Sequence, residues 1–173
     1  MQKKILKPFW KTLALGALAG MRANSAPAVV SHILSHHPSG QLENSPLKLI
    51  QSPKVANALK VLALGEFVGD KLPFAGDRIK PVSVTFRSLS GSLAGTSIYK
   101  ANGNHALAGA VLGAAAAFSS TFGSFYLRKM IVKKTGIYDP IIGAIEDILV
   151  IGAAISLIKY SEQESSELES AKK

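Results

Sequence analysis

The sequence predicts an all-α integral membrane protein, a polytopic helix bundle with about five spans. The first observation is the segment 101–127, which has no acidic or basic residue apart from the titratable His105. A helix needs roughly 20 mostly apolar residues to cross the hydrocarbon core of a bilayer. The second observation is that lysine and arginine flank the apolar runs, as membrane orientation signals do, and form no single basic stripe. We therefore expect the lipid bilayer as a partner and no nucleic acid.

The first predicted span covers residues 12–34 and is interrupted by polar residues and a proline. Arg22, Asn24 and Ser25 stand inside it, and Pro27 follows. Proline in a helix interior removes a backbone hydrogen bond and kinks the helix. Such an interruption survives in a membrane only where it is buried in protein or lines water. We expect a kinked first helix with Pro27 at the kink, and then a polar connector over residues 36–53.

Four further apolar segments follow, over residues 55–72, 82–99, 105–127 and 138–158. The segment 55–72 contains Lys60, whose long side chain can reach the interface, and Pro73 ends it. The segment 82–99 is short and rich in serine, glycine and threonine. These spans predict a single helix-bundle domain over residues 1–160, with a polar C-terminal tail over residues 161–173.

The distribution of basic residues predicts a cytoplasmic N-terminus. With five crossings, the inside segments carry the early lysines, then Lys71, Arg78 and Lys80, and then the basic cluster at 128–134. This arrangement obeys the positive-inside rule. If residues 82–99 were only re-entrant, the cluster at 128–134 would fall outside. Four spans plus a re-entrant segment is therefore the alternative to five spans.

Several ionisable side chains lie in or beside the predicted spans and form a possible intramembrane polar site. An unpaired charge at the bilayer centre costs roughly 2.5–3.5 kcal/mol on insertion scales, so these groups must be paired, hydrated or neutralised. With a rise of about 1.5 Å per residue, all of them fall in the inner half of the membrane or at its midplane. The six residues are Arg22, Glu66, Asp70, Arg87, Glu146 and Asp147.

Two interpretations of these charges stay open. We expect Arg22 to pair with Glu66 or Glu146, and Arg87 with Asp70 or the remaining acid. Such ion pairs could serve only to specify helix register. Alternatively, the same groups could form a hydrated path or an ion site, because intramembrane ionisable residues are functional candidates by default.

Glycines at i and i+4 recur in four of the apolar segments. Small residues at this spacing let two helix backbones approach closely, which is how membrane helices associate. We expect them to pack helices within one chain, and a homo-oligomer face on the segment 105–127 is the alternative. The pairs are Gly16/Gly20, Gly65/Gly69, Gly91/Gly95 and Gly109/Gly113.

Nothing in the motifs predicts an enzyme, a cofactor or catalytic residues. The sequence has no phosphate-binding loop, dinucleotide fingerprint or HExxH motif, and it has no cysteine. His32 and His36 have the i, i+4 spacing of metal ligands. The predicted topology places them at the outer surface, away from the acids near the inner one, so we expect no metal site.

The charged motifs resemble a bacterial family of uncharacterised membrane proteins, domain of unknown function 4126. The resemblance covers roughly residues 13–157. It implies a membrane protein, here of the bacterial cytoplasmic membrane, and marks the same charged residues, but implies no activity. The motifs are Gly20-Met-Arg22 with Pro27, Glu66-Phe-Val-Gly-Asp70-Lys71-Leu-Pro73, Asp77, Arg87 with Gly91, and Ala144-Ile-Glu146-Asp147.

Two functions agree with these observations. The first is a small transporter or channel-like protein that moves an ion or small solute past the intramembrane charges. The alternative is a membrane scaffold or assembly component whose charges are structural ion pairs. The substrate of the first is unknown.

Overall fold

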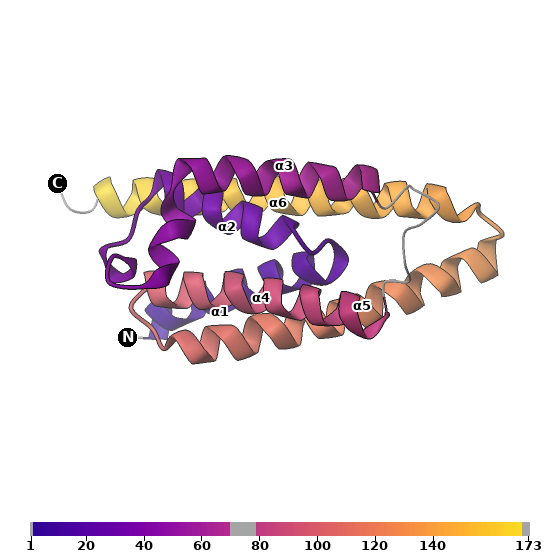
Figure 1. Ribbon diagram of the computed structural model, residues 1–173, viewed down its shortest axis with the longest axis horizontal. Coiled ribbons are helices and arrows are strands. Elements are labelled where there is room, and N and C mark those ends of the chain that lie inside the picture. Colours follow the sequence, from indigo (N-terminus) through magenta and orange to yellow (C-terminus); the bar gives the residue numbers. More distant parts are fainter. Residues whose placement is uncertain (1, 70–78, 171–173) are drawn as a thin grey trace.

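The computed structural model is a bundle of helices along one long axis (Figure 1). It describes the backbone of residues 2–69 and 79–170, with the side chains of residues 8–66, 79–167 and 170. Within this part of the chain no strand occurs, which confirms the all-α prediction. The predicted site residue Asp70 lies outside it. The elements are α1 (Gln2–Met21), α2 (Ser25–His36), η1 (Gly40–Leu42), η2 (Pro46–Gln51), α3 (Pro53–Gly69), α4 (Pro81–Ala101), α5 (Ala106–Thr135) and α6 (Asp139–Ser170).

The segment predicted as one kinked span is a hairpin of two helices, α1 and α2. Ser90, near the middle of α4, donates a hydrogen bond to the carbonyl of Ala23 at the tip of this hairpin. Ser39, just beyond α2, donates to the carbonyl of Ala101 at the end of α4, at 2.7 Å. The hairpin therefore enters the bundle at one end, turns halfway along it and returns (Figure 1). The predicted interruption of residues 12–34 is present, but the prediction of one kinked helix is wrong, because two separate helices occupy the segment.

Pro27 does not cause this change of direction. It is the third residue of α2, and the chain leaves the helical conformation earlier, at residues 22–24. In the first turn of a helix a backbone N–H has no partner within the helix, so a proline is tolerated there. The predicted kink at Pro27 is therefore wrong, and Pro27 belongs to the start of the second helix.

The helices α3 to α6 alternate in direction along the long axis, and both ends of the chain lie at the same end of the bundle (Figure 1). The start of α1 is therefore far from the basic cluster at 128–134, near the C-terminal end of α5. The predicted five-span topology has these two basic groups on the same side of the membrane. Because they lie at opposite ends, loop charge no longer selects an orientation for the N-terminus.

Glycines stand where α1, α4 and α5 approach one another. A Cβ atom added to Gly113 would lie 2.8 Å from the carbonyl carbon of Gly91 and 3.3 Å from the Cα of Gly95, both on α4. A Cβ at Gly16 would lie 2.5 Å from the Cβ of Ala116 on α5. By contrast, Gly65 faces open space, and the surroundings of Gly69 fall outside the described side chains.

The core is small, and large apolar side chains cover the outside of the bundle. Leu15, Leu18, Val30 and Val150 are among its buried members. The exposed ones include Val61, Leu62 and Leu64 on α3, Val82, Phe86 and Leu89 on α4, Leu107, Val111 and Phe118 on α5, and Ile141, Ile148, Leu149 and Ile155 on α6. Soluble monomers rarely expose continuous apolar surface on this scale.

Two of the described helices, α5 and α6, are long and apolar enough to cross a membrane. Only 22% and 17% of their most apolar windows are buried within the bundle, whereas a core helix of a soluble protein is mostly buried. The other expected spans also contain helices: α3 has 17 residues, and α4 has 21 but a polar composition. Residues 161–170 of the expected tail continue α6, where Glu164 forms an ion pair with Lys11.

Candidate functional site

The tip of the α1–α2 hairpin brings together charged residues from four helices. Arg22 leaves the end of α1 and is only 2% exposed. Its Nε donates to Oδ1 of Asp147 on α6 at 3.0 Å, and its Nη2 donates to the same oxygen. Its Nη1 donates to the backbone carbonyl of Glu66 on α3, at 3.5 Å. The structure thus pairs Arg22 with Asp147, and not with the carboxylate of Glu66 or Glu146 as expected.

The carboxylate of Glu66 caps the beginning of α2. Its Oε1 accepts a hydrogen bond from the N–H of Ala23, and its Oε2 accepts one from the N–H of Asn24, both at 2.8 Å. The first N–H groups of a helix have no partner within it, and the helix dipole makes this end positive. A carboxylate there satisfies the donors and the partial charge together, although it comes from a neighbouring helix.

Arg87 on α4 makes the corresponding contact at the end of α1. Its Nη1 donates to the carbonyls of Gly20 and Met21, each at 2.6 Å, and the residue is 4% exposed. Thr121 on α5 also donates to the carbonyl of Gly20, at 3.1 Å. The C-terminal end of a helix carries partial negative charge, so a guanidinium stabilises it. The expected pairing of Arg87 with Asp70 lies outside the described residues.

The end of α1 and the start of α2 therefore each contact a side chain whose charge is opposite to the partial charge of that helix end. Non-helical backbone at membrane depth is tolerated only where protein or water satisfies its polar groups. Arg87 does this for carbonyls at the end of α1, and Glu66 does it for the N–H groups of Ala23 and Asn24 just before α2. Sequence reasoning expected these side chains to pair with other side chains and missed their backbone partners. The signal available was the run Arg22 to Ser25, because asparagine and serine favour helix starts.

Glu146 belongs to a different group of charges, closer to the α5–α6 connection. Arg128 donates from Nε and Nη2 to the carboxylate of Asp139, at 2.8 and 2.6 Å. Its Nη1 lies 3.8 Å from Oε2 of Glu146. Adjacent helix residues point about 100° apart, so Glu146 and Asp147 contact separate arginines, as that angle predicts. A Cβ at Gly143 would lie 3.3 Å from Nη2 of Arg128, so this glycine leaves room for the guanidinium.

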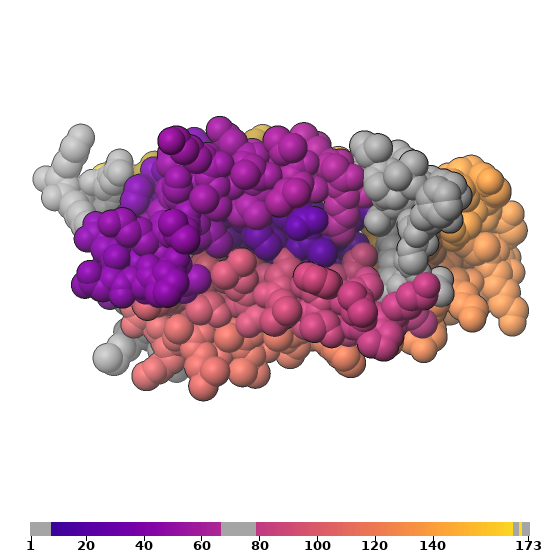
Figure 2. Space-filling view, in the orientation of Figure 1, coloured from indigo at the N-terminus to yellow at the C-terminus, as the bar shows by residue number. Residues whose placement is uncertain are grey.

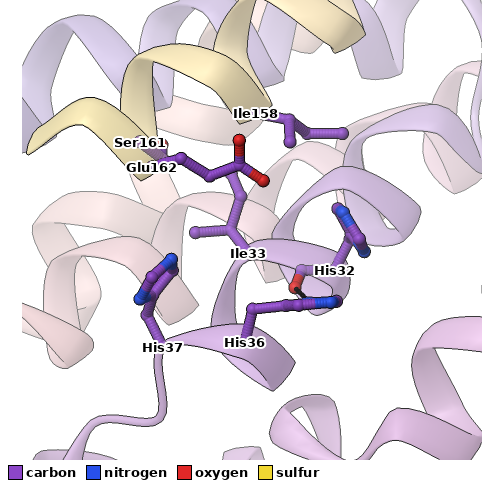
Figure 3. A pocket seen from close by; sticks show the side chains of 7 residues that line it. All are labelled: His32, Ile33, His36, His37, Ile158, Ser161 and Glu162. Carbon is purple, nitrogen blue, oxygen red and sulfur yellow. Dashed lines mark hydrogen bonds between the residues drawn. The ribbon is translucent and has the colours of Figure 1, made fainter. Parts of the chain in front are cut away.

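The three neighbouring histidines line a separate pocket between the end of α2 and α6 (Figure 3). The rings of His32 and His36 have centroids 4.3 Å apart, and Nδ1 of His36 lies 2.9 Å from the carbonyl of His32. A carbonyl only accepts, so this Nδ1 carries the proton. Ser161 and Glu162 complete the pocket with Ile33, His37 and Ile158.

This pocket lies at the end of the bundle opposite the α5–α6 connection, away from the hairpin tip. Nδ1 of His32 and Oγ of Ser161 are buried there without a hydrogen-bond partner. Among the described residues, no three histidine, cysteine or acidic side chains are placed to hold a metal ion together. The pocket is therefore a polar gap between helices, distinct from the charged hairpin tip.

Comparison with known proteins identifies a family. No curated protein and no solved structure matches the chain. One family model does, over residues 10–162, and it is described as a domain of unknown function, DUF4126. The matched segment contains α2, the part of α1 from Trp10 onward, and all the charged residues at the hairpin tip. The chain belongs to the DUF4126 family.

Proposed function

We propose that this chain is an integral membrane protein in which α3 to α6 cross the bilayer and the α1–α2 hairpin is re-entrant. The uncovered apolar side chains of these four helices support this arrangement. Tyr138, immediately before α6, and Tyr160 on α6 are both exposed and stand about 33 Å apart along the axis. Tyrosine favours the two membrane interfaces, and the hydrocarbon between them is about 30 Å thick.

The function we propose is the passage of a small polar solute or ion by way of the hairpin tip. One observation carries this proposal: a helix turns back at mid-bundle and its tip is only half-buried. Ala23, Asn24 and Glu66 all keep partial exposure, and α2 lies in a hollow between α3 and α4 (Figure 2). The Asn24 side chain makes no capping hydrogen bond. Transporters commonly place their sites at such interrupted helices near the midplane.

A second candidate function, a membrane scaffold, is favoured by the contacts of the charges themselves. Asp147 engages Arg22, Glu66 engages two backbone N–H groups and Arg87 engages two backbone carbonyls. These contacts are sufficient to hold the hairpin in place. In a scaffold the tip would be dry, whereas transport requires water to reach Asn24.

Thiol labelling at Asn24 separates the two functions. The chain has no cysteine, so Asn24→Cys introduces a single thiol at the tip. We expect a membrane-impermeant thiol reagent to label this cysteine when the reagent is added to native membrane vesicles of one of the two orientations. The matched control is Leu62→Cys on the exposed apolar face of α3, which lipid should protect. If Asn24→Cys stays unlabelled in folded protein in both vesicle orientations, the transport proposal is wrong and the scaffold remains.

We expect Glu66→Gln to destabilise the hairpin. Glutamine keeps one acceptor oxygen, but its NH2 group would face a second backbone N–H at the start of α2. Losing one charged acceptor and leaving a donor unsatisfied should lower the free energy of unfolding by about 2 kcal/mol. Thermal unfolding of the detergent-purified variant measures this, with the exposed Glu43→Gln as control. A Glu66→Gln variant as stable as its control would show that the carboxylate does not stabilise the hairpin.

A further inference from the structure

The last two turns of α5 carry three lysines that form no ion pair with any acid in the described part of the chain. Lys129, Lys133 and Lys134 are exposed, and among the described residues none of them forms an ion pair. Their neighbour Arg128 differs, because it turns inward to Asp139 and Glu146. Three exposed positive charges therefore lie near this end of the bundle.

Two of these lysines, Lys129 and Lys133, share a helix face with apolar and aromatic side chains. At about 100° per residue, Tyr126, Lys129, Met130 and Lys133 fall within roughly 100° of one another. Tyr126 is 60% exposed and Met130 is 48% exposed. We call these four residues the lysine face. Lys129 and Lys133 stand roughly 5 and 10 Å beyond Tyr126 along the axis, so the face changes from aromatic to cationic along its length.

Stabilisation of the helix itself accounts for only part of the lysine face. Cations near a helix C-terminus offset its dipole, but this effect is confined to the last turn. Lys133 lies in that turn of α5, whereas Lys129 lies before it. The C-terminal part of α5 also extends beyond α4 along the long axis (Figure 1), so α4 does not cover it.

We propose that the lysine face binds the headgroups of anionic phospholipids. The proposal rests on the membrane insertion argued above. Exposed apolar residues such as Phe118 lie earlier on α5, so the helix would pass from hydrocarbon to interface to headgroup in that order. Tyrosine rings favour the interface. Each lysine near an anionic membrane surface adds attraction that corresponds to about fivefold in lipid preference.

Quenching of tryptophan fluorescence by brominated lipid tests this directly. Trp10 is the single tryptophan of the chain and is exposed near the opposite end. In a Trp10→Phe background, Tyr126→Trp places the only fluorophore on the lysine face. The full-length variant is reconstituted in phosphatidylcholine vesicles that contain phosphatidylglycerol, with either one of the two lipids brominated. We expect brominated phosphatidylglycerol to be enriched severalfold at residue 126, and Lys129→Gln with Lys133→Gln to remove this enrichment.

The same measurement distinguishes failure of this inference from failure of the membrane proposal. The unaltered chain, with its fluorescence from Trp10, provides the reference for the other end. Equal quenching by both lipids at residue 126, or an enrichment that persists without the lysines, would overturn the lipid assignment while still showing insertion. Absence of quenching by either brominated lipid, at both tryptophan positions, would refute insertion itself. High salt should weaken the enrichment, because exposed charges are screened.

Discussion

Gly113→Ala is expected to destabilise the protein strongly, although alanine is the better helix former. The new Cβ would meet the backbone of Gly91 on α4, with the carbonyl carbon at 2.8 Å, and the Cα of Gly95 at 3.3 Å. Backbone atoms of a helix cannot turn away as a flexible side chain can, so α4 and α5 must separate. Overpacking of this kind costs typically 1–3 kcal/mol, and we expect about 3 kcal/mol here. Thermal unfolding in a mild detergent measures the loss.

The same helix offers a matched control at Gly123. A Cβ at Gly123 meets nothing within 4 Å. Replacing a helical glycine with alanine gains up to about 1 kcal/mol from helix propensity, so Gly123→Ala should be neutral or stabilising. The two substitutions are chemically identical and differ only in what surrounds them. Equal effects at both positions would show that α4 and α5 do not pack as closely as described.

The all-α class and the positions of the later helices could be predicted from local sequence. The apolar run 82–99 lies inside α4, and the runs 105–127 and 138–158 begin one residue before α5 and α6, because run length and helix-breaking residues are local properties. The boundaries are less accurate: α5 continues to Thr135 and α6 to Ser170. Lysine and glutamate are good helix formers, so a helix can extend beyond its apolar part into polar sequence.

The hairpin could not be predicted in the same way. Residues 12–34 are apolar and long enough for one crossing, and the local pattern offered Pro27 as the irregularity. What stabilises the turn at residues 22–24 is supplied by Arg87 and Glu66, distant in sequence, through hydrogen bonds to backbone groups. A sequence shows which side chains are charged, but it does not show that their partners are the backbone ends of another helix.

The choice of ion-pair partners could not be predicted from depth. The predicted depths placed the charged residues in the inner half of the membrane or at its midplane, but depth does not show which side chains face one another. In the structure Arg22 meets Asp147, and Glu146 meets Arg128. The set of charged residues was therefore predicted from their cost in a membrane. Which of them touch depended on the path of the backbone.

Asp147→Asn is expected to have the second large effect, because it removes the negative charge beside a buried guanidinium. The side chains of Arg22 and Asp147 are only 3% and 12% exposed. Removing one partner of a buried ion pair typically costs 3–5 kcal/mol, since the remaining charge stays desolvated. We expect a loss of about 3 kcal/mol in the free energy of unfolding, because asparagine retains an acceptor oxygen for Nε of Arg22. Chemical unfolding in detergent micelles measures it.

Asp139→Asn on the same helix is the control for this substitution. Its side chain is 56% exposed, and it accepts from Nε and Nη2 of Arg128 through its two carboxylate oxygens, whereas Asp147 accepts both bonds from Arg22 at one oxygen. Solvent screens the Asp139 pair, so the cost should be below about 1 kcal/mol. The double variant Arg22→Met with Asp147→Leu should recover stability relative to Asp147→Asn, because neither charge then remains in the interior. If Asp147→Asn were no more harmful than Asp139→Asn, water would reach Arg22 at the tip. That result would favour a hydrated passage at the tip over a purely structural ion pair.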